Sequence, residues 1–250
     1  MRRLLSTQRL NMQTVDFKHI ELSDGNKLLD LGCGEGRHVI AAYLEKNIQA
    51  VGVDLGFNDL KTTADKFSEF CQSENPDKSF GLSVANALSL PFEDNTFDVI
   101  ICSEVLEHIP DYESVLTEIE RVLLPGGSFI ASVPRAWPER ICWYFSSAYH
   151  QVEGGHLRIF DASQLRSQIE ALGFYYYHRH WAHALHSPFW WLKCMFWDSQ
   201  EKSLLIALYH KLLVWDLMQR PWLTRYLEAL LNPIMGKSIV MYFNKPKSAI

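Results

Sequence analysis

Short apolar runs alternate along the first half of the chain with segments in which apolar residues recur every three or four positions. The runs are typical of buried strands, and they lie at 27–31, 49–54, 80–85, 97–102 and 128–133. The segments with helical spacing lie at 38–44, 58–74 and 111–123. Strand and helix therefore alternate, which predicts an α/β fold with a doubly wound, mainly parallel sheet.

The first apolar run breaks into three glycines at alternate positions, Gly32, Gly34 and Gly36, and a helical segment follows. A strand, a glycine turn and a helix let the backbone approach a ligand closely and point a helix N-terminus at it. The second run ends in Asp54, 22 positions after Gly32. Nucleotide-binding α/β folds place a carboxylate for ribose hydroxyls at about this distance.

The spacing of the glycines argues against a dinucleotide. A pyrophosphate-binding fingerprint requires a third glycine at position 37, where this chain has Arg37. Asp30 and Glu35 would also repel a pyrophosphate. We therefore expect a ligand with a cationic head and no phosphate, and we disfavour a nicotinamide-dependent oxidoreductase.

At these residues the chain resembles the class I S-adenosylmethionine (SAM) methyltransferases, in particular those like methyltransferase type 11. Their first motif, D-x-G-x-G-x-G, matches residues 30–36, and the resemblance extends over about residues 25–180. Later segments that look like the family's motifs occur in the right order, at 90–92, 104–108, 124–127 and 155–160. The resemblance implies a seven-stranded Rossmann-like sheet, with strands at 174–180 and 238–243 after a helix at 162–172. It also implies methyl transfer from SAM to an acceptor, with release of S-adenosylhomocysteine.

The resemblance implies a set of cofactor-binding residues: Asp30, Gly32, Gly34, Gly36, Asp54, Leu55, Asn86, Ala87, Ser103 and Glu104. Asp54 would bind both ribose hydroxyls, and the glycines would leave room for the methionine moiety. Asp30 would either accept from the α-ammonium group or cap the loop amides. Glu104 or Ser103 would also accept from that ammonium group, unless Glu104 only caps the helix that follows.

Asn86 departs from the family pattern, because many relatives carry an aspartate there to accept a hydrogen bond from the adenine amino group. An asparagine can still accept through its amide oxygen. Cofactor binding is therefore expected to survive.

The sequence designates no catalytic residue. His108 and His156 lie where the acceptor is expected, and imidazole titrates near neutral pH, so both are candidates for a general base. Tyr149 and His150 are weaker candidates. The alternative is that these side chains are structural and that methyl transfer relies on proximity and alignment alone.

Residues 181–236 form a helical insertion before the last strand of what we expect to be a single domain over 1–250. The insertion holds six of the eight tryptophans. Helices are expected at 189–197, 201–218 and 222–231, separated by Pro188, Pro221 and Pro233. The segment 203–218 is apolar almost all round but too short and interrupted for a membrane span. The insertion could form an ordinary cap, line an acceptor pocket or lie on a bilayer surface.

The amino-acid composition limits the kinds of acceptor and binding partner that we expect. The net charge of −5 gives no overall attraction for nucleic acid, so a small or lipid-like acceptor such as a quinone is expected. The five cysteines show no C-x-x-C spacing, which predicts free thiols and no metal site. Polar residues interrupt the N-terminal apolar stretch, so we expect a cytoplasmic protein, with peripheral membrane contact as an option. A tRNA base as acceptor, or a catalytically silent binding subunit, remain alternatives.

Overall fold

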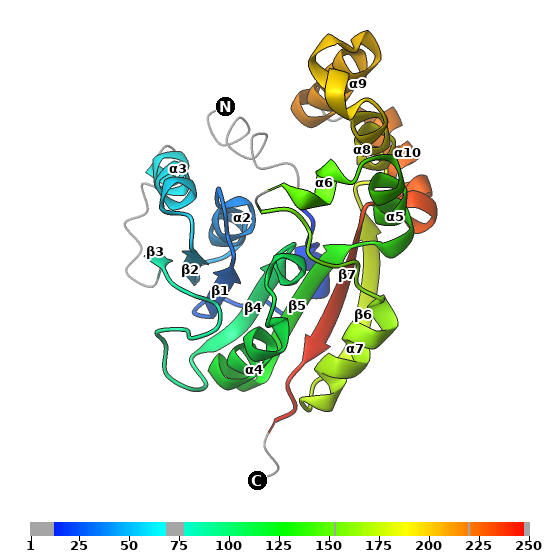
Figure 1. Ribbon diagram of the computed structural model, residues 1–250. Coiled ribbons are helices and arrows are strands. Elements are labelled where there is room, and N and C mark those ends of the chain that lie inside the picture. The colour runs from blue at the N-terminus through cyan, green and yellow to red at the C-terminus, as the bar shows by residue number, and fades with distance from the viewer. Residues whose placement is uncertain (1–12, 69–77, 153, 220, 248–250) are drawn as a thin grey trace.

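In a computed structural model that describes residues 13–68, 78–152, 154–219 and 221–247, seven strands form one sheet (Figure 1). Their order is β3-β2-β1-β4-β5-β7-β6, and β7 runs antiparallel to both of its neighbours. The strands are β1 (Lys27–Leu31), β2 (Gln49–Asp54), β3 (Ser79–Val84), β4 (Phe97–Ser103), β5 (Leu123–Pro134), β6 (Tyr175–Ala182) and β7 (Ser238–Asn244). The mainly parallel seven-stranded sheet expected from the sequence is confirmed.

Helices cover both faces of the sheet (Figure 1). One face carries α4 (Tyr112–Val122) and α7 (Ala162–Ala171), whose N-termini are capped by the side chains of Asp111 and Asp161. The other carries α2 (Arg37–Glu45), α3 (Phe57–Ser68) and the short helix η1 (Phe17–His19). Because β1 is buried on both faces, its consecutive residues Leu28 and Leu29 enter different hydrophobic clusters.

More helices stand above the edge of the sheet at which β1, β2, β4, β5 and β6 end (Figure 1). Between β5 and α7 lie α5 (Ala136–Phe145) and α6 (Ala148–Gln151). Between β6 and β7 lie α8 (His186–Met195), η3 (Trp197–Lys202), α9 (Leu204–Gln219) and α10 (Trp222–Met235). A third cluster joins these two groups, in which Cys142, Tyr149 and Cys194 are buried beneath partly buried tryptophans. The sequence analysis did not foresee α5 and α6.

The insertion differs from its expected boundaries. Trp181 belongs to β6, which continues to Ala182. Pro188 lies in the first turn of α8, where its missing N–H costs no helical hydrogen bond, so this helix begins earlier than expected. Pro233 does not end a helix, because α10 continues past it to Met235. Only Pro221, at the N-cap of α10, separates two helices as predicted.

Two other elements also differ. The Pro-Gly-Gly sequence at 125–127 is typical of a turn, but it lies within β5, where the backbone of Gly126 and Gly127 exchanges hydrogen bonds with Lys245. Gly126 has a φ of +88°, and the pairing of β4 with β5 shifts register here, so the segment is an irregular strand. The helix expected at 58–74 is described from Phe57 to Ser68, and residues 69–74 of that prediction lie outside the described residues.

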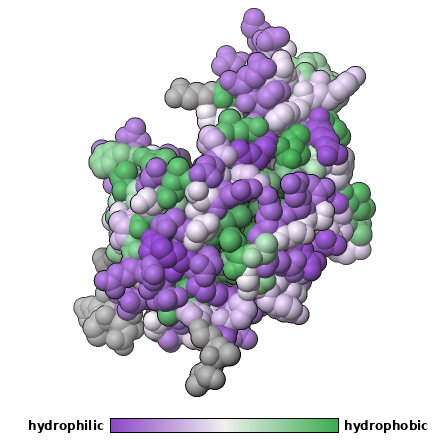
Figure 2. Space-filling view, turned by 60° about the horizontal axis from the view of Figure 1, so that its bottom comes forward, coloured by the Kyte–Doolittle hydropathy of each residue, from purple (hydrophilic) through white to green (hydrophobic). Residues whose placement is uncertain are grey.

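The surface carries hydrophobic patches separated by polar side chains on the face drawn in Figure 2. α9 is apolar almost all round, yet only Ile206 and Leu213 of its residues are buried. Large apolar side chains exposed on α9 and α10 include Leu204 (73%), Trp222 (78%), Tyr226 (63%) and Ile234 (62%). Within the described parts of the chain, no helix combines the length and the apolar character that crossing a membrane requires.

Candidate functional site

A cavity of about 560 Å³ lies at the carboxyl edge of the sheet, where open α/β sheets place their ligands. We call it the cofactor cavity. It is bounded by the ends of β1, β2 and β4 and by the segments that follow β3 and β4. Its lining residues are Leu31, Gly32, Gly34, Val53, Asp54, Leu55, Ala85, Asn86, Ala87, Leu88, Glu104, Val105, His108, Ile109 and Pro110.

The three loop glycines have left-handed φ values of +71°, +49° and +82°, but each serves a different purpose. A Cβ at Gly32 would lie 2.3 Å from Val105, and one at Gly36 would lie 2.4 Å from Thr63. A Cβ at Gly34 would meet nothing within 4 Å. Gly32 and Gly36 therefore permit close packing within the protein, whereas Gly34 borders the open space of the cavity.

The carboxylate of Asp54 joins the two loops that border the cavity. Its Oδ2 accepts a hydrogen bond from the Gly34 amide at 2.8 Å, and its Oδ1 accepts one from the Gly56 amide at 2.8 Å. A carboxylate oxygen can accept two hydrogen bonds, so each retains capacity for a ligand hydroxyl.

Asp30 lies behind the glycine loop and outside the lining of the cavity. It is 1% exposed, and its Oδ2 accepts a hydrogen bond from the Val39 amide, in the first turn of α2, at 2.9 Å. Burial raises the pKa of Asp30 to about 7, although the Val39 hydrogen bond opposes this. The sequence left open the α-ammonium group or the loop amides as partners of Asp30, and the observed partner is instead this amide of α2.

Of the other predicted cofactor residues, some line the cavity and Ser103 lies beneath its lining. Asn86 borders the cavity, and its Oδ1 accepts a hydrogen bond from the Leu88 amide at 3.0 Å. Glu104 also borders it, has a left-handed φ of +57°, and accepts a hydrogen bond from Ser132 through Oε1. Ser103 is buried beneath the lining, with its hydroxyl 2.8 Å from that of Ser132.

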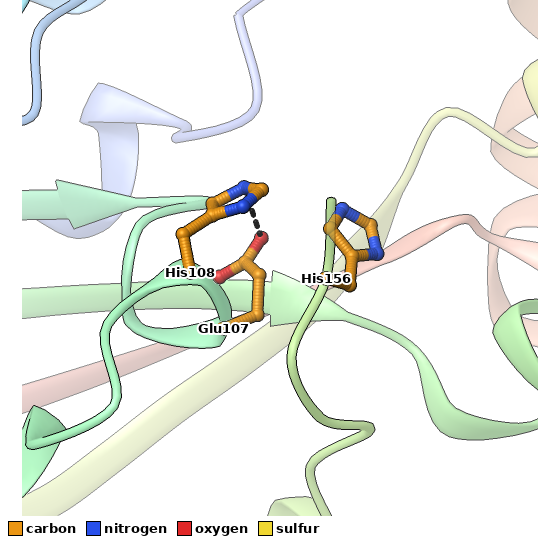
Figure 3. Close-up of side chains that lie close together, drawn as sticks. All are labelled: Glu107, His108 and His156. Carbon is orange, nitrogen blue, oxygen red and sulfur yellow. Dashed lines mark ion pairs between the residues drawn. The ribbon is translucent and has the colours of Figure 1, made fainter. Parts of the chain in front are cut away.

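Two histidines and two glutamates gather next to the cofactor cavity. Glu107 and His108 lie on the short helix η2 (Leu106–His108), and Figure 3 shows them beside His156, from the loop before α7. The Leu157 amide donates to the Glu107 carbonyl oxygen at 2.9 Å, which ties this loop to η2. The rings of His108 and His156 are 5.0 Å apart.

Glu139, from α5, completes this group. Its Oε1 lies 2.6 Å from Nδ1 of His156 and accepts a hydrogen bond from Trp143, while Oε2 accepts one from the Tyr149 hydroxyl. Burial alone would raise the pKa of Glu139, but the hydrogen bond and charge of His156 lower it overall. When His156 is neutral, a carboxylate at this position favours its proton on Nδ1, which leaves the lone pair of Nε2 free.

Residues 6–179 match the family model described as a methyltransferase domain. The chain belongs to the class I SAM-dependent methyltransferase family. It is similar to the methyltransferase GfsG of Streptomyces halstedii, with 34% identity over 113 residues, or 44% of this chain and 38% of that protein. It is also similar to a demethylmenaquinone methyltransferase of Lysinibacillus sphaericus, with 35% identity over 116 residues, or 46% and 47%.

The match to these curated relatives thus spans less than half of their length. Among solved structures, the [4+2]-cyclase SpnF superposes with a TM-score of 0.61 over 99% of this chain and 82% of that one. The identity to SpnF is 20%, so this likeness supports the fold alone.

In this member of the methyltransferase family, Glu139 is a site residue that was not predicted from the sequence. The available signal was the position of this acid in a helix that is apolar except for Glu139 and Arg140, three residues before the buried Cys142. Its partner His156 was a candidate because of the family motif, but the sequence could not show which carboxylate holds it.

Glu107, His108 and His156 also place one ligand atom each within 4.8 Å of one another, so this trio has the composition of a metal site. Burial, followed by the negative charge of Glu104, raises the pKa of Glu107 well above its usual range. Nδ1 of His156 is already engaged by Glu139 at 2.6 Å, so this ring offers only Nε2 to a further ligand.

Proposed function

We propose that this chain binds SAM in the cofactor cavity and transfers its methyl group to a small or lipid-like acceptor. One arrangement carries the proposal. Asp54 and Gly34 border one part of the cavity, and His108, in contact with the His156–Glu139 pair, borders another. A cofactor site and a candidate base therefore lie side by side.

The cavity suits SAM in charge and shape. The spare acceptor capacity of Asp54 matches two ribose hydroxyls, and the open space at Gly34 accommodates a ligand against the backbone. Leu55, Asn86 and Ala87 line the part expected to receive the adenine. Glu104 offers a carboxylate to the α-ammonium group. Because SAM carries no phosphate, these acids do not face the negative charge of a pyrophosphate.

SAM supplies an electrophilic methyl group on a sulfonium, and the protein supplies alignment and proton transfer. An acceptor hydroxyl that loses its proton as the new bond forms requires a base. Nε2 of His156 would take this proton, and Glu139 would stabilise the resulting imidazolium. Burial lowers the pKa of His108, which disfavours a second positive charge beside that imidazolium.

An apolar pocket between helices above the sheet supports a lipid-like acceptor. α5 and α8 border an open, almost wholly apolar pocket of about 600 Å³, lined by residues such as Ile141, Phe145 and Trp191. Such a lining favours an isoprenoid, acyl or other lipid-like group. That the similar protein of Lysinibacillus sphaericus is named for demethylmenaquinone agrees with this class.

We further propose that α9 and α10 rest on a membrane surface. Their exposed leucines and aromatic residues would enter the interfacial layer of the bilayer without crossing it. This arrangement would let a lipid-like acceptor approach the pocket between α5 and α8 from the membrane.

Methyl transfer can be tested with radiolabelled SAM and fractionated lipid extracts, with the Asp54→Ala variant as a control. Label that enters a lipid fraction with the wild type, but not with the variant, supports the proposal. If SAM binds and no lipid or small-molecule fraction is labelled, the lipid acceptor is wrong. Labelling of tRNA instead would favour a nucleic-acid acceptor, and no labelling at all would favour a silent binding subunit.

A further inference from the structure

A second group of side chains suited to metal binding lies where β6 leads into α8, and it includes no residue that lines the cofactor cavity. His183, His186 and Glu228 each present a ligand atom, and these atoms lie within 4.8 Å of one another. They border a separate cavity of about 420 Å³, to which Asp216 and Arg225 also contribute. The proposed methyl transfer uses none of these residues.

The chain holds the two histidines together through a tight turn. His183 follows the last residue of β6 with a left-handed φ of +65°. The His186 amide donates to the His183 carbonyl oxygen at 3.0 Å, and the two rings are 5.5 Å apart. Thr14 fixes the first ring, because its hydroxyl lies 3.1 Å from Nε2 of His183. An L residue rarely adopts this backbone conformation unless the surroundings require it.

Glu228 comes from α10, more than forty positions later, and specific hydrogen bonds hold that helix against the turn. Asn232 accepts from the Ala184 amide at 3.0 Å, and the Ser187 hydroxyl donates to the Met235 carbonyl oxygen at 2.7 Å. The turn and α10 are thus fixed relative to one another by two hydrogen bonds, about one and two helical turns after Glu228.

The cluster leaves hydrogen-bonding capacity unused. Within the residues that the structure describes, Oε1 of Glu228 and Nδ1 of His186 are buried and lack a hydrogen-bond partner. Buried polar atoms without partners are uncommon and destabilising, so a ligand that both could bind is expected.

We propose that His183, His186 and Glu228 bind one divalent transition-metal ion, with zinc as the preferred class. Two imidazole nitrogens and one carboxylate oxygen form a typical zinc ligand set, which leaves a fourth position open. Bonds of about 2.1 Å place tetrahedral ligand atoms about 3.4 Å apart, so atoms that now lie within 4.8 Å of one another would close by at most about 1.4 Å. The ion would tie β6 to α10, and its open position would face the cavity beside Asp216.

Calorimetry with zinc chloride on the chelator-treated full-length protein tests this site. We expect one equivalent to bind, with affinity at least about tenfold lower in His186→Gln and in Glu228→Gln. His210→Gln, which changes an exposed histidine of α9, is the matched control and should bind like the wild type. This titration uses neither SAM nor an acceptor, so its failure is distinct from failure of the proposed methyl transfer.

A wild type that takes up no zinc would overturn the site, as would variants that bind unchanged. Zinc binding that disappears in His156→Gln and persists in the other variants would assign the ion to the cluster beside the cofactor cavity instead. Circular dichroism of the zinc-free variants checks their folding. Should they fail to fold, cobalt(II) bound to the wild type supplies the readout, because tetrahedral coordination gives strong visible absorption and octahedral coordination would contradict the proposal.

Discussion

The carboxylate of Asp54 accepts a hydrogen bond from the amide of Gly34, with 2.8 Å between Oδ2 and N. The end of β2 thereby fixes the glycine loop that follows β1. The same carboxylate holds the loop after β2 through Gly56. The residue proposed to bind the ribose is thus also the residue that shapes both walls of the site.

Asp54→Ala should weaken SAM binding by about 1.5–3 kcal/mol, the scale of hydrogen bonds to a charged group. The loss has two sources, since both the ribose contact and the loop anchor disappear. Asp54→Asn, which keeps one acceptor oxygen, should lose less. Calorimetry on both variants checks this order, and equal affinity of all three proteins would refute the role of Asp54.

Alanine at Gly34 should mainly affect SAM binding, whereas alanine at Gly36 should mainly affect stability. Gly34→Ala should remain folded, with about 1–2 kcal/mol of strain from an alanine at a φ of +49°, but bind SAM weakly, because its Cβ points into open space that the ligand would fill. Gly36→Ala should lose more stability, because its Cβ would lie 2.4 Å from Thr63. Thermal melting and SAM titration of the two variants separate these effects. A Gly34→Ala variant with wild-type affinity would show that the cofactor lies elsewhere.

Glu139→Gln should lower kcat by about 10²-fold or more if His156 acts as the base, within the range typical of general catalysis. The glutamine cannot stabilise an imidazolium by charge, so the pH profile of kcat should shift as well. SAM affinity should stay the same, because Glu139 does not line the cofactor cavity. A normal kcat in this variant would favour catalysis by alignment alone.

Asp30 should make the stability of the protein depend on pH. Its pKa is about 7 in the folded state, well above the ordinary value of 3.8 for an aspartate in an unfolded chain. The folded state therefore binds more protons than the unfolded state between these two pH values. Stability from this group therefore decreases as pH rises from about 4 to 7, by up to about 1.4 kcal/mol per pH unit. Urea unfolding of the wild type and Asp30→Asn at several pH values measures the difference. Parallel curves would contradict the raised pKa.

Trp222→Glu combined with Tyr226→Glu should abolish recovery of the protein with floating liposomes. Each aromatic side chain contributes about 1.5–3 kcal/mol when it leaves water, and the glutamates would repel an anionic surface. Tyr175→Glu is the matched control, because Tyr175 is 66% exposed at the opposite end of β6. A wild type that does not float would dismiss the membrane contact.

Much of the fold was predictable because it depends on local patterns. Buried strands such as β1 and β4 are recognisable as apolar runs, and the glycine loop identifies the carboxyl edge of the sheet. The sequence indicated that Asp30 belongs to the glycine loop. It could not indicate which group the carboxyl contacts, because that depends on the direction of the side chain.

The pairs that define chemistry were harder to predict. Glu139 meets His156, and Glu228 meets His183, only because α5, α8 and α10 pack above the sheet. Nothing in the local sequence of either glutamate fixes that packing. The position of Pro233 was misjudged for a related reason, because the contacts of α10 with the turn after β6 hold the helix together past this residue.

Titration of the purified chain with SAM and S-adenosylhomocysteine tests the central claim most directly. Both ligands should bind at one site, and Gly34→Ala and Asp54→Ala should weaken both while the variants remain folded. A folded wild type that binds neither ligand, or variants that bind both as well as the wild type, would contradict the assignment of the cofactor cavity.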